Sequence, residues 1–93
     1  MFYVYEHWRP DKNVCFYVGK GHGPRAYVLK RGKNHRYNNT VSKVVAAGFA
    51  VEVRIIAKGM EEAAAFALEI ERIAFWRGQG HHLTNQTAGG RRL

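Results

Sequence analysis

Two short runs rich in Tyr, Phe and Val, separated by a cluster of turn-forming residues, restrict this chain to folds that contain a β-hairpin. The runs occupy residues 2–8 and 14–20, and the segment Arg9-Pro10-Asp11-Lys12-Asn13 lies between them. Aromatic and β-branched residues favour strands, whereas proline, aspartate and asparagine favour turns. The pattern therefore predicts two antiparallel strands joined by a short loop.

The predicted hairpin has two different faces, because successive side chains of a strand point to opposite sides of the sheet. The aliphatic faces of the two strands are expected to form the core and to leave the tyrosine faces together beside a cleft. The tyrosine face would carry Tyr3, Tyr5, His7, Cys15, Tyr17 and Gly19, and the apolar face would carry Phe2, Val4, Val14, Phe16 and Val18.

The rest of the chain predicts helices around a third strand. Pro24 suits the first turn of one helix, and residues 38–47 form a second helical segment. Residues 51–55 alternate as a strand, and residues 60–77 give the clearest helical pattern. The order ββααβα predicts an α/β fold in which helices flank a small antiparallel three-stranded sheet.

The charge of the chain predicts a polyanionic partner. A length of 93 residues gives one domain, 1–93, in which 15 Lys and Arg oppose 7 acidic residues, for a net charge of +8. A membrane surface is the competing polyanion, but the basic residues are spread along the chain and no apolar run approaches about 18 residues. The single Cys15 excludes an internal disulfide, and the N-terminus lacks a secretion-signal pattern. We therefore expect a cytoplasmic protein that binds nucleic acid and no membrane.

One glutamate of the helix at 60–77 is a candidate metal ligand. At about 100° per residue, Glu69 lies close to Phe66 and Ile73, whereas Glu71 points about 160° away from Glu69. Because apolar residues cover much of the helix circumference, we expect the helix to be central. A carboxylate among bulky apolar neighbours needs compensation, which a divalent cation supplies. The alternative is that both glutamates are surface charges paired with Arg72 or Arg77.

Two tyrosines and one arginine are candidates for catalysis of phosphate chemistry. Arg25 follows the glycine-rich segment 19–23 and is either a solvated helix charge or a planar donor for a phosphate, which the glycines would let approach the backbone. Tyr5 and Tyr17 are either hairpin packing residues or catalytic groups. A tyrosine with a pKa of about 10 is a poor base unless positive charge lowers that pKa, and Lys20, Arg25 and a metal on Glu69 are the available sources.

The histidines are weaker candidates. One cysteine and no repeated His or Cys pair at finger-like spacing argue against structural zinc, for His22, His35 and the pair His81-His82 alike. His35 lies in a basic polar stretch with Arg36, which favours contact with a nucleic-acid backbone. The segment 19–21 lacks the serine or threonine and the glycine spacing of a nucleotide P-loop.

Taken together, these residues resemble the GIY-YIG nuclease family over almost the whole chain, from Phe2 to Gly90. The resemblance rests on the order and spacing of several short motifs, each weak by itself. They are the triplets Tyr3-Val4-Tyr5 and Tyr17-Val18-Gly19, then Gly19-Lys20-Gly21, Arg25, Leu68-Glu69 with Ile73, Leu83-Thr84-Asn85 and Gly89-Gly90.

The resemblance implies a role for each matched residue. Glu69 would bind one divalent ion, Mg²⁺ with Mn²⁺ as a substitute, that orients the scissile phosphate. Tyr17 would act as general base on the attacking water or place that water, with Tyr5 supporting it, and Arg25 would offset charge on the transition state. Lys20 would lie near the phosphate or lower the pKa of Tyr17, and Asn85 would hold the substrate backbone or brace the cleft. The expected nucleic-acid contacts are Lys20, His22, Lys30, His35, Arg36 and Asn85.

Two positions depart from the family pattern. The glycine expected at the start of the first triplet is Tyr3. The histidine that some members place one helical turn after the arginine is replaced by Leu29. Either His22 or His35 takes over from that histidine, or the chain relies on tyrosine alone.

The predicted function is a metal-dependent endonuclease that hydrolyses phosphodiester bonds in DNA, nicking one strand at a time with low intrinsic sequence preference. Cutting of both strands would need a homodimer, two sequential nicks or a partner that supplies recognition. One alternative is a non-catalytic, basic nucleic-acid-binding module of the same fold, and another is a basic protein-interaction domain. The sequence leaves RNA open as a substrate and does not separate repair, restriction, mobile-element and phage roles.

Overall fold

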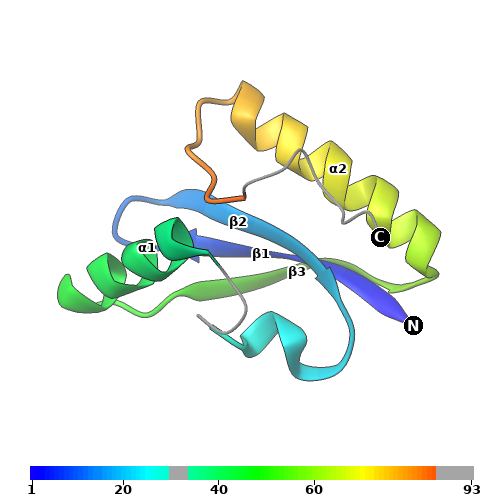
Figure 1. Ribbon diagram of the computed structural model, residues 1–93, viewed down its shortest axis with the longest axis horizontal. Helices are drawn as coiled ribbons and strands as arrows, with labels where there is room; N and C mark the ends of the chain where they lie inside the picture. The colour runs from blue at the N-terminus through cyan, green and yellow to red at the C-terminus, as the bar shows by residue number, and fades with distance from the viewer. Residues whose placement is uncertain (30–33, 86–93) are drawn as a thin grey trace.

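The computed structural model describes residues 1–29 and 34–85. It confirms a small α/β fold with a three-stranded antiparallel sheet and two α-helices (Figure 1). The predicted first helix is a 3₁₀ turn of five residues instead. In chain order the elements are β1 (Phe2–Arg9), β2 (Val14–Gly21), the 3₁₀ helix η1 (Gly23–Tyr27), α1 (His35–Ala46), β3 (Glu52–Met60) and α2 (Glu62–Gly78).

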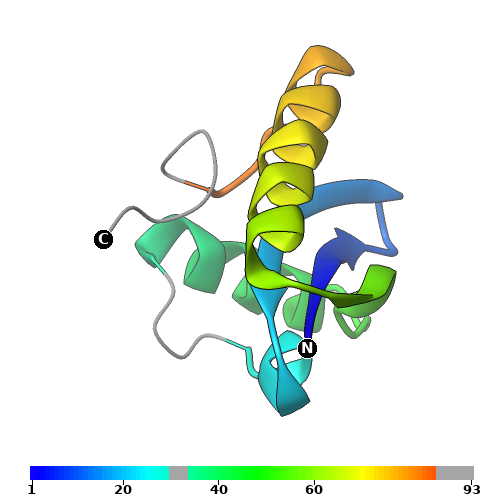
Figure 2. The same ribbon diagram turned by 90° about the vertical axis from the view of Figure 1, so that its right-hand side faces the viewer.

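The first strand is the centre of the sheet, whose order is β2-β1-β3. Figure 1 shows α2 on one side of the sheet and α1 with η1 on the other. The N-terminus lies beside the start of α2 in Figures 1 and 2, as the pairing of Phe2 with Met60 requires. Both faces of β1 are therefore covered, so the predicted tyrosine face is interior.

A β-bulge in the hairpin overturns part of the predicted face assignment. The register runs from His7 opposite Tyr17 to Trp8 opposite Cys15, which leaves Phe16 as an extra residue in β2. A one-residue insertion moves the residues beyond it to the other face. Cys15 therefore lies on the apolar face, whereas Phe16 lies on the tyrosine face, and the prediction was wrong for both.

The bulge divides the apolar side chains into two clusters, one on each face of the sheet. Under α2, the buried cluster comprises Val4, Trp8, Cys15, Val18, Ala65, Ile73 and Leu83. Under α1, the smaller cluster comprises Phe16, Tyr37 and Val41.

The longest helix is not central, contrary to the prediction. Its buried residues Ala65, Glu69 and Ile73 recur every four positions, so only one side of α2 packs on the sheet. Ile70 and Phe75 on its outer side are 41% and 48% exposed. Of the helices in the described ranges, none is long and apolar enough to cross a membrane.

The helix α1 begins three residues before the predicted start at 38, because Asn34 caps it. The Asn34 side chain accepts a hydrogen bond from the Tyr37 amide at 2.9 Å. Such a cap satisfies an amide that has no partner within the helix. The cap places Tyr37 in the first turn, where it faces the sheet and is fully buried.

The segment after α2 closes the outer edge of β2. The Thr84 amide donates to the Phe16 carbonyl at 2.7 Å, and the Cys15 amide donates to Nδ1 of His81 at 3.1 Å. Covering an edge in this way satisfies backbone groups that a strand would otherwise pair. The C-terminal segment is thereby brought beside the residues that the sequence analysis assigned to catalysis.

Candidate functional site

Three of the predicted catalytic side chains form one connected set of hydrogen bonds. Arg25 donates to the hydroxyl of Tyr5, and the hydroxyl of Tyr5 donates to that of Tyr17. The centroids of the two tyrosine rings lie 6.2 Å apart, on neighbouring strands. Tyr5 is buried, Tyr17 is half-buried and Arg25 is exposed. The set therefore connects the interior of the sheet with the surface.

The glycines of the segment 19–21 make room for this set. A Cβ atom at Gly19 would collide with the ring and hydroxyl of Tyr5, and a Cβ atom at Gly21 would lie 2.7 Å from Cδ of Arg25. Since real Cβ atoms do not approach other atoms so closely, only glycine fits at both positions. In the structure these glycines make room for the side chains of Tyr5 and Arg25, and the approach of a phosphate to their backbone stays a prediction.

The unexpected Tyr3 fixes the turn that carries Arg25. Its hydroxyl donates to the Gly23 carbonyl at 2.5 Å and accepts from the Ala26 amide at 2.9 Å. Gly23 has a φ of 60°, a conformation that favours glycine. Replacement of the family's glycine by Tyr3 therefore ties η1 to β1 and removes none of the proposed catalytic groups.

The two glutamates of α2 have different environments, as the helical periodicity predicts. Glu69 is 8% exposed, whereas Glu71 lies on the exposed side. Arg72 donates to Glu6 at 2.7 Å, and Arg77 donates to the Asn85 carbonyl at 2.7 Å, so both arginines have partners other than Glu71. The Glu69 carboxylate lies close enough to Tyr17 to raise its pKa.

The donor set near Tyr17 is suited to Mg²⁺ held by few protein ligands. Among residues 1–29 and 34–85, no group of three or more His, Cys, Asp or Glu side chains is arranged to hold a metal ion. Mg²⁺ usually keeps several waters and is bound through one or two carboxylates together with substrate phosphates. The single carboxylate of Glu69 fits that mode of binding.

The pKa of Tyr17 is shifted in the direction opposite to the one expected. Burial and the Glu69 carboxylate raise it above its usual value, and they outweigh Arg25 and the hydrogen bond from Tyr5, which lower it. Burial also raises the pKa of Tyr5 and of Tyr37, to which the neighbouring Tyr17 contributes. Tyr17 is therefore a protonated phenol at neutral pH in the absence of a cation on Glu69.

Lys20 does not lie beside Tyr17. It is paired with Val4 on the face that α2 covers, and its Nζ is 3.2 Å from Oε2 of Glu62. The same Nζ lies 5.3 Å from the centroid of the Phe2 ring. The expectation that Lys20 lowers the pKa of Tyr17 was wrong, because alternation along β2 directs the two side chains to opposite faces.

The histidines considered as replacements for the family histidine both lie at the start of a helix and are exposed. His22 is exposed before η1 and contacts the edge of the Phe2 ring at 5.2 Å between centroids. His35 is exposed at the first position of α1, next to the exposed Arg36. Lys30, the remaining predicted nucleic-acid contact, lies outside the described residues.

Asn85 uses its side chain to brace the edge of β2. Its Oδ1 accepts from the Val18 amide at 3.0 Å, and its Nδ2 donates to the Val18 carbonyl at 2.8 Å. It is 9% exposed. Of the two roles that the family resemblance implies for Asn85, this geometry favours bracing the site over holding the substrate.

His7 and Tyr37 form a buried pair beside Tyr5 and Tyr17 that was not predicted from the sequence. Nε2 of His7 lies 2.6 Å from the Ala26 carbonyl, which can only accept, so Nε2 carries the proton and Nδ1 accepts from the Tyr37 hydroxyl at 2.7 Å. Both residues are fully buried. The pair joins β1, η1 and α1 behind the site. The alternation of Tyr3, Tyr5 and His7 gave a signal for His7, but nothing in the sequence pattern singled out Tyr37.

Comparisons with models of protein families, with curated proteins and with solved structures found no match. The family resemblance therefore rests on the sequence motifs.

Proposed function

We propose that this chain is a divalent-metal-dependent endonuclease of the GIY-YIG type that hydrolyses phosphodiester bonds in DNA. One observation carries the proposal: Arg25, Tyr5 and Tyr17 form a hydrogen-bonded set, and the buried carboxylate of Glu69 lies close enough to Tyr17 to raise its pKa. A donor for phosphate oxygens, a hydroxyl for a water and a carboxylate for a cation are the groups that phosphodiester hydrolysis needs. The four residues come from four different elements of the fold.

Each side chain has a task in an in-line attack of water on the phosphorus. The exposed Arg25 would donate to a non-bridging phosphate oxygen and offset the charge that develops there. Tyr5, fixed beside Gly19, would hold the Tyr17 oxygen in place. Glu69 would hold Mg²⁺, which on binding would orient the phosphate and stabilise the leaving oxygen.

The raised pKa of Tyr17 supports the placing role over the role of general base. A phenol that stays protonated at neutral pH orients the attacking water through its oxygen without removing a proton from it. A cation bound to Glu69 would cancel one of the two causes of the raised pKa. The phenolate fraction of Tyr17 would therefore increase only when the metal is bound.

Cleavage of labelled supercoiled, branched and single-stranded DNA tests the proposal, with Mg²⁺, with Mn²⁺ and with chelator. We expect the cation to be required and Tyr17→Phe to lower the rate at least about 100-fold, as for loss of a transition-state contact. Tyr27→Phe is the control, because Tyr27 is 64% exposed on η1. A folded wild type that binds DNA but cuts none of the substrates would support the non-catalytic binding module instead.

A further inference from the structure

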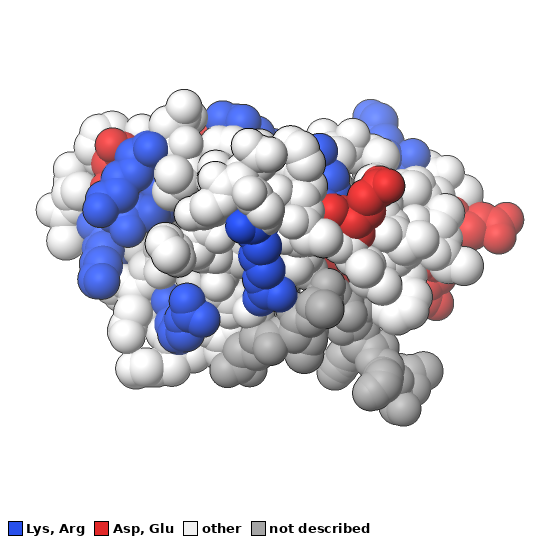
Figure 3. All heavy atoms as spheres, turned by 90° about the horizontal axis from the view of Figure 1, so that it is seen from above, with Lys and Arg blue, Asp and Glu red and all other residues white. Residues whose placement is uncertain are grey.

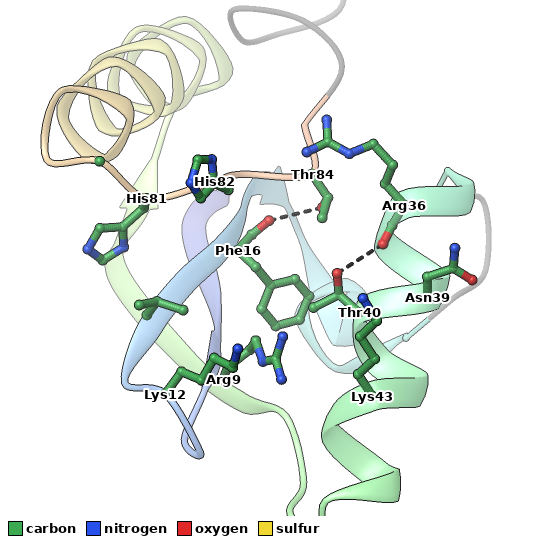
Figure 4. A pocket seen from close by; sticks show the side chains of 12 residues that line it. Arg9, Lys12, Phe16, Arg36, Asn39, Thr40, Lys43, His81, His82 and Thr84 are labelled. Atoms are coloured by element: carbon green, nitrogen blue, oxygen red, sulfur yellow. Dashed lines mark hydrogen bonds between the residues drawn. The ribbon is translucent and has the colours of Figure 1, made fainter.

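A basic groove lies at the end of the molecule where β1 turns into β2. Its volume is about 430 Å³. Figure 4 shows α1 on one side, His81 and His82 on the other, and the ring of Phe16 between them. The side chains from α1 are Arg36, Asn39, Thr40 and Lys43, and the hairpin contributes Arg9 and Lys12.

The lining of the groove is suited to an anion. None of the described residues that line it is acidic. Arg9 is neutralised by Asp11, to which its Nη2 donates at 2.8 Å, whereas Lys12, Arg36 and Lys43 are exposed. Pockets for drug-like ligands are mostly apolar, but only Val14 and Phe16 here have large apolar side chains. The groove therefore favours a phosphate group over an apolar molecule.

Two cations and a hydroxyl of α1 are arranged in a row. Arg36, Thr40 and Lys43 recur at intervals of four and three positions, so they share one side of α1 while Tyr37, Val41 and Val44 face the sheet. Seven residues of helix span about 10.5 Å, which equals about three nucleotide rises of 3.4 Å. A row of this length suits successive phosphates of a strand better than one small anion.

The opposite wall adds a further donor. Nδ1 of His81 accepts from the Cys15 amide, so Nε2 is the ring nitrogen left to donate. The ring packs against Trp76 at an angle of 33°, with 4.6 Å between centroids. His81 is thereby held in one orientation at the edge of the groove.

The groove and the tyrosine site are neighbours along the same strand. Phe16 lines the groove and Tyr17 follows it in β2, while Thr84 lines the groove and Asn85 braces the strand beside Tyr17. In the view of Figure 3, the charged side chains at the end that carries the β1–β2 turn are mainly blue, and most red side chains lie toward the opposite end. The charge distribution would therefore direct a polyanion from the tyrosine site toward the groove.

We propose that this groove binds the phosphodiester backbone of the nucleotides that flank the cleaved bond. The identity of the ligand as a nucleic acid rests on the proposed function. The groove would hold the strand through Lys12, Arg36 and Lys43, with phosphate contacts that carry no sequence information.

Lys43→Glu and Lys58→Glu form a matched pair that tests the proposal. Both lysines are exposed, and each substitution replaces a positive by a negative charge, but Lys58 lies on β3, outside the groove. Binding of a labelled single-stranded DNA oligonucleotide is followed by fluorescence anisotropy in the presence of chelator, so that no cleavage occurs. We expect Lys43→Glu to weaken binding about tenfold at low salt and Lys58→Glu to weaken it less than about twofold.

The salt dependence gives a second measurement. The double variant Arg36→Ala/Lys43→Ala should lower the slope of log K against log salt by about 1.4, since each neutralised phosphate of a single strand contributes about 0.7. Equal weakening by Lys43→Glu and Lys58→Glu would overturn the proposal, because the loss of affinity would then depend only on the net charge of the protein. Displacement of the oligonucleotide by inorganic phosphate far below the concentration at which sodium chloride acts would also overturn it, in favour of a small-anion site.

Failure of the groove and failure of the nuclease activity are distinguishable. If the wild type binds through the groove but cuts no DNA with either metal, binding of a nucleic-acid backbone in the groove stands and the proposed hydrolysis fails. If the wild type cuts DNA and Lys43→Glu binds and cuts as Lys58→Glu does, the hydrolysis stands and the groove proposal fails. Circular dichroism of each variant excludes unfolding as the cause.

Discussion

The two faces of the central strand β1 bury polar groups in different ways. Under α2, the fully buried carboxylate of Glu6 accepts from Nε1 of Trp8 at 3.0 Å, Nε1 of Trp76 at 2.7 Å and Nε of Arg72 at 2.7 Å. The protein thus supplies a compensating charge and several donors to this carboxylate. A buried charge satisfied in this way has little capacity left for a ligand.

Under α1 and η1, hydrogen-bonded polar groups extend from the interior to the surface. The hydrogen bonds run from the buried Tyr5 to the half-buried Tyr17 and the exposed Arg25. This difference indicates which buried carboxylate is the better candidate for a functional role. Glu6 accepts from three donors of its own chain, whereas Glu69 lies close enough to the half-buried Tyr17 to raise its pKa. We therefore expect substitutions of the two carboxylates to separate stability from activity.

The largest effect is expected for Glu69→Gln. If Glu69 holds the cation, the amide should lower metal-dependent cleavage about 1,000-fold, or about 4 kcal/mol in the activation barrier. DNA affinity and thermal stability should change little. Glu71→Gln is the matched control two positions away on the exposed side of α2. Equal rates for the two variants would remove Glu69 from the proposed mechanism.

Glu6→Gln should have the opposite profile. Loss of the charge leaves Arg72 and two indole N–H groups facing a neutral amide, and we expect a loss of about 3 kcal/mol in the free energy of unfolding, measured with urea. Glu52→Gln is the control, because Glu52 pairs with Arg54 in an exposed ion pair. Cleavage per folded molecule should be unchanged by Glu6→Gln. A variant that remains stable but inactive would abolish the distinction between the two buried carboxylates.

The sequence was sufficient for the features that depend on period. Alternating residues predicted the hairpin and the third strand, and the helical angle separated Glu69 from Glu71. Alternation also places Lys20 opposite Tyr17, so the error on Lys20 came from giving its proximity in sequence more weight than the period of the strand.

Other features depend on contacts that no local pattern contains. The bulge at Phe16 is stabilised by packing against Tyr37, more than 20 residues away in the sequence, and the side chain of Asn85 is satisfied by the backbone of Val18. The raised pKa of Tyr17 depends on its burial and on its proximity to Glu69, neither of which can be deduced before the fold is known. The groove combines α1, the hairpin and the segment after α2 for the same reason.

Tyr37→Phe tests whether the interior of the tyrosine face contributes to stability as well. The substitution leaves Nδ1 of the buried His7 without the donor at 2.7 Å, and we expect a loss of about 2 kcal/mol in the free energy of unfolding. Tyr27→Phe, at a 64% exposed position, should change it by less than about 0.5 kcal/mol. Cleavage should fall only a few-fold, because η1 keeps its contacts to Tyr3. A stability equal to that of the wild type would show that the hydrogen bond is replaced in solution.

In alkali, groups buried on the two faces of the sheet should lower the stability at different pH. Burial and Glu6 raise the pKa of the Cys15 thiol, under α2, to about 12. Above about pH 8.5 the unfolded chain loses this proton and the native state keeps it, so the free energy of unfolding falls by about 1.4 kcal/mol per pH unit. The raised pKa values of Tyr5, Tyr17 and Tyr37 act in the same direction, but only above about pH 10, the value for an unfolded tyrosine.

Urea unfolding between about pH 8 and pH 11 resolves the two contributions. Cys15→Ala should remove the decline below pH 10, and Tyr17→Phe should reduce the slope above pH 10. Tyr27→Phe serves as the control on the exposed side of η1. If Tyr17→Phe leaves the alkaline slope unchanged, Tyr17 is not held as a buried phenol, and the argument for a water-placing role loses its basis.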